Sequence, residues 1–471
     1  MLVSTTRHKQ MTAQVAAVLG FAEEPSVSER NPIAAAFGFP GAYWWESDSK
    51  LHQPHRYASF DAGSTATPEK RPDARQYSST APGWFAGNAP PRTRPPKQHV
   101  QPLTHLDFRP RRPLGKGKFG EVYLTTHAAT GKLYALKVLH KRLLYNSKLR
   151  ERARNERRIN GSLGPHPFVV RMQYAFATDR CLCLVLDLAP CGELFQLVKA
   201  AHPWKSGKTK PGKFPEQAAR FYVAECLLAL EFLHERRVLY RDLKPENVLI
   251  GRDGHVCISD FGLSKPGVNH PLRGARSMCG TPEYLAPEIL RGTHEHGLAV
   301  DFWCLGALFY ELLDGYPPWF TKDKKKLLER VARRDLELKL PRGLKSKLSK
   351  DGELCLRALL HRDNTVRLGS DGDAQAVKDH PCFSMVDFDG LLARHVEPPF
   401  VPQHFVADLR TDEEVPWADV QPDVDRKRQS MDIADARFDE IFAQFEYRPE
   451  RDPEASDDVL MKYSSVLMEE A

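Results

Sequence analysis

The 471-residue chain lacks an apolar run near the roughly 18 residues that a membrane-spanning helix needs, so we expect no membrane span. It also has few cysteines: nine without regular spacing, and Cys181 and Cys183 lie in an apolar run typical of a strand rather than a zinc site. No secretory signal is evident. The odd cysteine count then favours a reduced intracellular protein, and we expect it in the cytoplasm, with nuclear entry open.

A strong charge imbalance is also missing: the chain has 68 Lys and Arg and 61 Asp and Glu, which gives a net charge of +7. The basic residues are scattered, which does not indicate a nucleic-acid partner. Arg7 and Lys9 within an acid-free first twenty residues leave a transit peptide open as an alternative. At 41% hydrophobic and 27% charged residues, the composition is that of a globular protein with a sizeable core.

Residues 1–105 show no sustained apolar periodicity and are broken by Pro, Gly, Ser and Ala. The arm ends in a Pro-rich stretch at 89–96, typical of an extended linker, and we predict that it is disordered. The aromatic patch at 43–45 leaves a docking motif open. We also predict a flexible C-terminus at 450–471.

From Phe108 onward the pattern changes. Alternating and apolar runs predict strands at 108–114, 121–126, 133–139 and 181–188, and helices at 148–159 and 221–234, the second beginning near Pro215. We expect 200–213 to be a surface loop. The fold class is therefore α+β, a small β-rich part followed by a larger helical part, with the chemistry between them.

Gly115, Gly117 and Gly120 have the G-x-G-x-x-G spacing, which dinucleotide-binding turns share. A dinucleotide fold places a helix after the loop, whereas here a strand follows. This argues against a dinucleotide-dependent oxidoreductase and favours a hairpin whose backbone N–H groups cover phosphates.

Lys137 lies in a strand with apolar neighbours, where an unpaired ammonium would be costly. Glu156 on the following helix is the predicted partner. The pair would hold Lys137 against the α- and β-phosphates of a nucleotide.

The run from Tyr240 to Asn247, followed by Asp260-Phe261-Gly262, carries the remaining chemistry. Asp242 is the predicted base that accepts a hydroxyl proton, and Lys244 would neutralise the transferred phosphoryl group. Asn247 and Asp260 are oxygen donors of the kind that Mg²⁺ prefers. Together they indicate phosphoryl transfer from ATP to a hydroxyl.

These motifs resemble a eukaryotic protein kinase, and the likeness continues through Gly280 to Glu288 and Asp301-Phe302-Trp303. The resemblance implies a bilobal fold at 108–383, ATP and Mg²⁺ as cofactors, and a pair between Glu288 and Arg367. It places the nucleotide site at Leu114, Gly115, Lys116, Gly117, Lys118, Phe119, Gly120, Glu121, Val122, Lys137 and Glu156.

Lys244 followed by Pro-Glu-Asn is similar to serine/threonine kinases, and three features resemble the AGC group, which includes protein kinases A, B and C. They are Tyr240 before Arg-Asp, Cys279 before Gly-Thr-Pro-Glu, and a C-terminal tail at 384–449. The tail ends in Phe442 and Phe445, similar to a hydrophobic motif, and we expect it to dock beside the Glu156 helix. Glu446 stands where relatives carry a phosphorylatable residue; it would partly replace the phosphate, or it is simply a solvated acid.

Ser277 matches the activation-loop phosphosite of the group, with Arg241, Lys265 and Arg152 as the cations that the resemblance supplies. It implies an upstream activating kinase of the phosphoinositide-dependent type. Acidic residues at Glu193, Glu246 and Glu311 imply protein substrates with Ser or Thr after Arg. We expect a monomer.

Asn160 departs from the pattern, because relatives usually place Leu there in a hydrophobic column linking the lobes. The active arrangement is then expected to depend more on the tail. The alternative function is a pseudokinase scaffold, against which the intact Lys137, Glu156, Asp242, Asn247 and Asp260 argue.

Overall fold

The computed structural model describes residues 103–116, 120–200, 213–291, 295–333, 335–401, 413–420 and 445–448. The predictions for the arm before residue 103, for the loop at 201–212 and for 450–471 lie outside these residues. All described residues belong to one compact unit of the chain.

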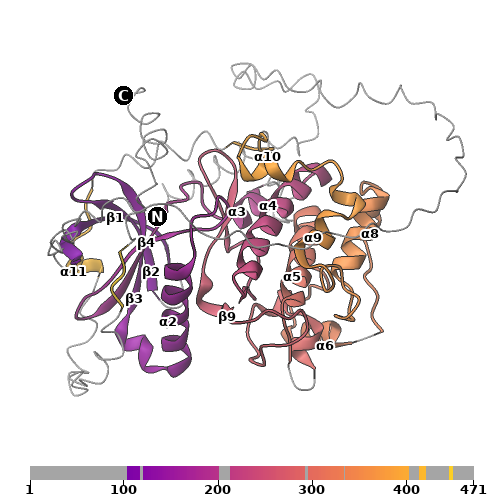
Figure 1. The fold of residues 1–471 in the computed structure, drawn as a ribbon, viewed down its shortest axis with the longest axis horizontal. Coiled ribbons are helices and arrows are strands. Elements are labelled where there is room, and N and C mark those ends of the chain that lie inside the picture. Colours follow the sequence, from indigo (N-terminus) through magenta and orange to yellow (C-terminus); the bar gives the residue numbers. More distant parts are fainter. Residues whose placement is uncertain are drawn as a thin grey trace, which may run out of the picture. The chain divides into compact units, whose positions relative to one another are not determined.

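The small lobe is built on an antiparallel sheet of five strands in the order β1-β2-β3-β5-β4. The strands are β1 (Phe108–Lys116), β2 (Gly120–His127), β3 (Leu133–His140), β4 (Met172–Ala177) and β5 (Cys181–Leu186). Helix α2 (Ser147–Ser162) lies beside the sheet (Figure 1). Asn146 caps it, with its side-chain oxygen accepting from the backbone N–H groups of Lys148 and Leu149.

Side chains alternate between the faces of this sheet and form two separate apolar clusters. One contains Leu136, Val138 and Val185, and Trp417 and Val420 of the tail complete it. The other contains Leu139, Leu182 and Leu184, together with Ala153 of α2, and Phe445 of the tail completes it. Both faces of the sheet are therefore covered in part by residues from the end of the chain.

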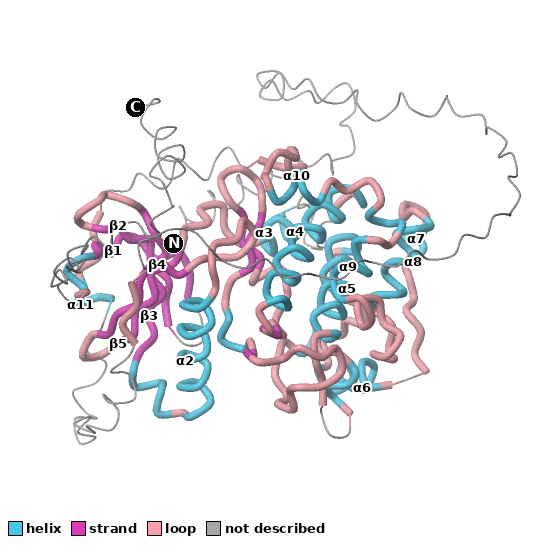
Figure 2. The backbone as a smooth tube through the Cα atoms, viewed as in Figure 1, coloured by secondary structure: helices cyan, strands magenta, loops and turns pink. Residues whose placement is uncertain are grey.

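The large lobe is helical, as Figure 2 shows. Its centre is the pair α4 (Glu216–Glu235) and α5 (Ala299–Asp314), and nearly every side chain of α5 is buried. The other described helices are α3 (Leu194–Ala200), α6 (Lys324–Ala332), α7 (Arg342–Lys345), α8 (Lys350–Leu359), α9 (Asp373–Lys378), α10 (Phe388–Leu392) and, in the tail, α11 (Trp417–Val420). None of the described helices is long and apolar enough to cross a membrane.

Two pairs of short strands in the large lobe hold the loops that carry the chemical residues. β6 (Val238–Leu239) pairs with β9 (Lys265–Pro266), and β7 (Val248–Ile250) pairs with β8 (Val256–Ile258). The loop between β6 and β7 and the loop between β8 and β9 are thereby held side by side. Each contributes a carboxylate to the site.

The α+β class and the two lobes are confirmed. The predicted strands are present with ends that differ by one or two residues. Helix α4 begins at Glu216, directly after Pro215 at its N-cap, as predicted. The strand that follows the glycine loop is β2, as expected for a phosphate-covering hairpin.

Candidate active site

Asp301 in α5 holds the backbone that carries the predicted base. Its carboxylate is fully buried and accepts from the N–H groups of Tyr240 at 2.9 Å and Arg241 at 2.7 Å. His234 of α4 lies 2.8 Å from the same carboxylate. Arg241 adopts φ 70°, a conformation that L-residues rarely adopt, and these bonds fix it there.

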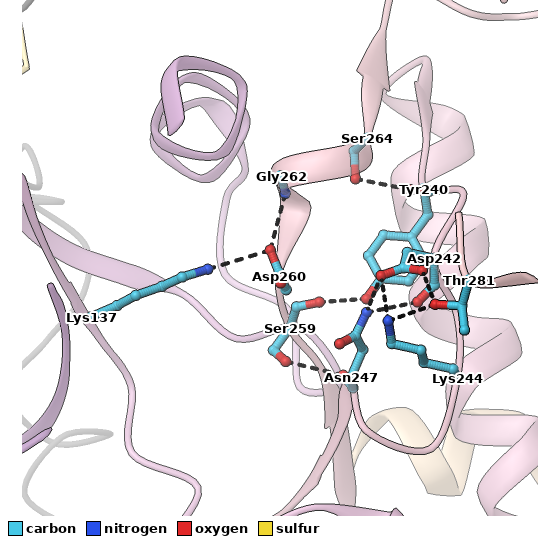
Figure 3. A network of polar contacts seen from close by, with 10 residues as sticks. All are labelled: Lys137, Tyr240, Asp242, Lys244, Asn247, Ser259, Asp260, Gly262, Ser264 and Thr281. Atoms are coloured by element: carbon cyan, nitrogen blue, oxygen red, sulfur yellow. Dashed lines mark hydrogen bonds and ion pairs between the residues drawn. The ribbon is translucent and has the colours of Figure 1, made fainter. Parts of the chain in front are cut away.

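Asp242 lies at the centre of a closed polar network (Figure 3). Thr281 donates to one carboxylate oxygen at 3.0 Å, and Lys244 donates to the other at 2.9 Å and to the Thr281 hydroxyl at 2.8 Å. The amide of Asn247 donates to the backbone carbonyl of Asp242 at 2.8 Å and to its carboxylate at 2.9 Å. The structure brings the three predicted catalytic residues together, and Thr281 bridges Asp242 and Lys244 as the resemblance implies.

Asp260 approaches this network from the second loop, with φ 59°. Its carboxylate accepts from the N–H of Gly262 at 3.2 Å and from Lys137 at 3.3 Å. Burial raises the pKa of Asp260, but the charge of Lys137 and the Gly262 N–H more than offset this, so the pKa is lowered overall. The residue is an ionised carboxylate at neutral pH.

The predicted pair of Lys137 and Glu156 is present, at 2.6 Å between Nζ and Oε1. Both side chains are largely buried, and burial lowers the pKa of Lys137, yet the carboxylates of Asp260 and Glu156 raise it above its usual range. Lys137 therefore stays protonated. It joins β3 of the small lobe to Asp260 of the large lobe.

Asn247 and Asp260 fit a magnesium ion. Asn247 uses its amide nitrogen toward Asp242, which leaves its carbonyl oxygen as an acceptor, and Asp260 is ionised. Groups of three or more His, Cys, Asp and Glu arranged to hold a metal are absent from the described residues. Two protein oxygens suffice here, because Mg²⁺ is usually held by one or two protein ligands together with substrate phosphates.

The structure describes the two strand ends that flank the glycine loop. Leu114, Gly115 and Lys116 end β1, and Gly120, Glu121 and Val122 begin β2; Gly117, Lys118 and Phe119 lie outside the described residues. A Cβ on Gly120 would lie 1.7 Å from the carbonyl oxygen of Val138, so no other residue fits there. Lys116 pairs with Glu121 at 2.6 Å and, by hydrogen bonding, lowers its pKa.

Ser277 lies beside the catalytic loop, where Arg241 donates to its hydroxyl at 2.7 Å. A phosphate on Ser277 would thus be next to a guanidinium fixed to the loop of Asp242. The roles of Lys265 and Arg152 at this position stay predictions.

Glu311 of the large lobe lies in a cluster of acidic residues with Glu246 and Glu283. Tyr284 donates to its carboxylate, and burial, reinforced by the charges of Glu246 and Glu283, raises its pKa to about 7. Glu193, also predicted to bind Arg, forms an isolated bridge to Leu249.

The tail end docks beside α2 as expected for Phe445, which is 4% exposed within the cluster that contains Ala153. Tyr447 pairs with Ala175 of β4 through two backbone bonds, at 3.0 and 2.9 Å. The carboxylate of Glu446 accepts from the N–H of Leu103 at 3.1 Å and lies 3.4 Å from Arg448. Phe442 lies outside the described residues.

Sequence reasoning missed Arg157, which donates to the carbonyl oxygens of Phe445 at 3.2 Å and Glu446 at 2.7 Å. A pairing across nearly three hundred residues leaves no local pattern. It also missed Trp417, whose indole N–H donates to the carbonyl of Phe108 at 3.0 Å. The available signal was the occurrence of a large aromatic residue in a polar tail, which indicates a side chain that packs against the domain.

The expected pair of Glu288 and Arg367 is present as two parallel bonds, at 2.6 and 2.9 Å, with Arg367 2% exposed. It anchors the segment after Thr281 to the interior of the large lobe.

The model of the protein kinase domain family matches residues 108–383. The chain is 39% identical over 304 residues to the serine/threonine-protein kinase Sgk2 of Homo sapiens, covering 64% of this chain and 77% of that protein. It is 39% identical over 296 residues to the RAC family serine/threonine-protein kinase homolog of Dictyostelium discoideum, covering 63% and 62%.

The serine/threonine-protein kinase sck2 of Schizosaccharomyces pombe is 39% identical over 298 residues, which cover 63% of this chain. The chain spans 44% of the length of sck2 and 32% of Protein kinase 3 of Dictyostelium discoideum. The matched domain, which makes up more than half of the chain, contains every residue of the polar network around Asp242. The chain belongs to the protein kinase family, as a member of its AGC group.

Proposed function

We propose that the chain catalyses transfer of the γ-phosphoryl group of ATP to Ser or Thr hydroxyls that follow Arg in protein substrates, in intracellular signalling. The observation that carries this is the network of Asp242, Lys244, Asn247 and Thr281, together with the bond from Lys137 to Asp260 on the adjacent loop. It is assembled with the Lys137–Glu156 pair closed. A scaffold requires none of these contacts.

Asp242 accepts the proton of the substrate hydroxyl and orients its oxygen for in-line attack. Lys244 is already bonded to Asp242 and Thr281, so its ammonium is preorganised to neutralise charge on the transferred group. Lys137 would bind the α- and β-phosphates. Asn247 and Asp260 would hold Mg²⁺, which would neutralise negative charge on the nucleotide phosphates.

The acidic group around Glu311 supports a preference for Arg before the target residue, because a guanidinium binds carboxylates with charge-assisted hydrogen bonds. Arg241 beside Ser277 supports activation by phosphorylation of that residue, by an upstream kinase of the phosphoinositide-dependent type. We further propose that the protein acts as a monomer, in the cytoplasm with access to the nucleus.

The test is transfer of labelled phosphate from ATP to an Arg-Arg-x-Ser peptide, after treatment with an upstream activating kinase. Asp242→Asn is compared with wild type and with Asp371→Asn, which changes an exposed loop carboxylate. Transfer lost in Asp242→Asn alone establishes the activity and the base. If wild-type protein transfers nothing while it still binds ATP, the scaffold function replaces this one.

A further inference from the structure

The excess positive charge of the chain is concentrated in one segment of the large lobe. Residues 322–350 contain twelve Lys and Arg and four Asp and Glu, a net charge of +8, while the whole chain carries +7. All other residues together are therefore close to neutral, with a net charge of −1. The basic residues were expected to be scattered, and this segment is the exception.

This basic segment lies at the surface. It runs from the loop before α6 to the first residue of α8, and Figure 2 places α7 and α8 at the edge of the large lobe farthest from the small lobe. Ion pairs within the described residues involve only two of its cations, Lys326 with Asp323 and Arg333 with Asp335. Every Lys and Arg that the structure describes in the segment is exposed: Lys322, Lys324, Lys325, Lys326, Arg330, Arg333, Lys339, Arg342, Lys345, Lys347 and Lys350.

The first turn of α6 is an unfavourable place for such charge. Lys324, Lys325 and Lys326 occupy it, and no acidic residue shares the turn with them. The N-terminus of a helix carries a partial positive charge, so cations there lower the stability of the helix. Asp323 at the N-cap supplies one carboxylate for three ammonium groups. Stability of the fold does not account for these lysines, which indicates a use outside the fold.

The outer face of α6 presents cations beside exposed aromatic rings. Its inner face is already occupied, because Leu327 and Val331 belong to the core of the large lobe. Just before α6, Tyr316 and Phe320 are 38% and 40% exposed, with stacked rings 5.1 Å apart. Arg330 of α6 donates to the backbone carbonyl of Phe320 at 3.4 Å, so the basic and aromatic groups lie together.

The type of cation favours an extended anionic surface as the partner. Eight of the eleven exposed cations are Lys. Lys is a hydrated point charge on a flexible stem, whereas Arg is suited to bidentate pairing with single carboxylates and phosphates. Clusters of about four to eight Lys or Arg on an amphipathic helix are typical of proteins that bind anionic lipids. Aromatic rings are also common at the level of the lipid headgroups.

We propose that the basic segment, with the lysines at the start of α6 as its main contact, binds the anionic surface of a lipid membrane. The attachment is peripheral and electrostatic, since the apolar face of α6 stays in the core. The rings of Tyr316 and Phe320 add contacts with the headgroups. The attachment would bring the chain to proteins held at the same surface.

The experiment is sedimentation of the full chain, without ATP, with vesicles of phosphatidylcholine alone or mixed with phosphatidylserine. We expect binding to the mixed vesicles only, and release as the salt concentration rises, because salt screens exposed charges. Lys324→Glu, Lys325→Glu and Lys326→Glu combined should weaken binding at least about tenfold. Acids suit the first turn of a helix, so this variant should unfold no more easily than wild type.

The control variant combines Lys132→Glu, Lys148→Glu and Arg154→Glu. These are three exposed cations of the small lobe, so the net charge changes by the same amount. The control should bind the mixed vesicles like wild type. The corresponding triple Gln variant of α6 removes charge without adding acids, and its binding should fall between wild type and the Glu variant.

Equal binding of wild type to both kinds of vesicle, or equal losses in the α6 and control variants, would overturn the proposal. So would absence of binding by wild type. In that case, a raised KM of the α6 variant for an Arg-Arg-x-Ser peptide extended by acidic residues would assign the segment to protein substrates instead. The vesicle measurement involves no phosphate transfer, so its result does not depend on the proposed function.

Discussion

The two lobes complete their interiors in different ways. The core of the large lobe is one continuous cluster drawn from residues 159–400. Each of the two clusters of the small lobe instead includes residues from beyond position 413, Trp417 and Val420 on one face and Phe445 on the other. The core of the large lobe ends with Leu391 and Phe400 at the start of the tail, whereas the small lobe is completed by residues much nearer the end of the chain, so control of the small lobe can come from there.

The largest expected effect lies inside the large lobe, at Arg367. Arg367→Met leaves the carboxylate of Glu288 buried without its cation, and we expect a loss of about 3–5 kcal/mol in the free energy of unfolding. Urea denaturation followed by circular dichroism measures it. Arg342→Met, at an exposed position, should change stability little; a loss below about 1 kcal/mol at Arg367 would show that the large lobe does not depend on this pair.

His234 gives the large lobe a pH-dependent part of its stability. Burial lowers the pKa of His234, but hydrogen bonds to Asp301 and Asp373 raise it to about 9. Because the folded pKa lies above the unfolded value near 6.5, this stabilisation is complete below pH 6.5 and is lost as the pH rises through about 9. It amounts to about 3 kcal/mol.

Unfolding in urea at a series of pH values checks this, with His234→Gln as the reference that cannot gain the proton. The difference in stability between wild type and variant should shrink at high pH. A difference that stays constant across that range would mean that His234 is neutral in the folded protein.

In the small lobe the expected effect is smaller and local. Trp417→Ala removes the indole that donates to Phe108 and packs against Phe176, and we expect about 1–2 kcal/mol less protection of β1. Hydrogen exchange of residues 108–116 measures it. Asp419→Ala on the same helix is exposed and should leave β1 protected; equal exchange in both variants would show that the tail segment does not support the sheet.

The smallest effect concerns recognition, which the proposed function assigns to the large lobe. Since the pKa of Glu311 is about 7, its charge is lost as the pH falls through that value. KM for the Arg-containing peptide should then rise several-fold below neutral pH. KM for a peptide with Ala in place of Arg serves as the comparison and should not show this rise. Glu311→Gln should remove this pH dependence, and its persistence there would assign recognition of Arg to other residues.

The sequence predicted the parts of the site that lie close together along the chain. Asp242, Lys244 and Asn247 occur in one loop, and their spacing alone indicates their chemistry. The pair of Lys137 and Glu156 was also predictable, because a Lys in a buried strand requires a partner and the next helix offers an acid. In each case the residues that meet in the site lie within about twenty positions of one another along the chain.

Contacts made by the tail were less predictable. Phe445 was expected in a groove because of its exposed apolar pattern, but Arg157 gave no sign that its guanidinium binds carbonyl oxygens near the other end of the chain. Backbone acceptors carry no sequence signature. Nor did composition reveal that Asp301 would hold the strained backbone of Arg241.

The pairing of Tyr447 with Ala175 bears on the behaviour of the protein in concentrated solution. β1 and β4 are the outermost strands of the sheet, and β1 contains Pro110 and Pro113, which have no N–H to offer another chain. β4 contains no proline, and the backbone of Tyr447 pairs with that of Ala175 in this strand. Release of Tyr447 would expose these groups to other copies of the chain, so this contact of the tail would also guard the sheet against self-association.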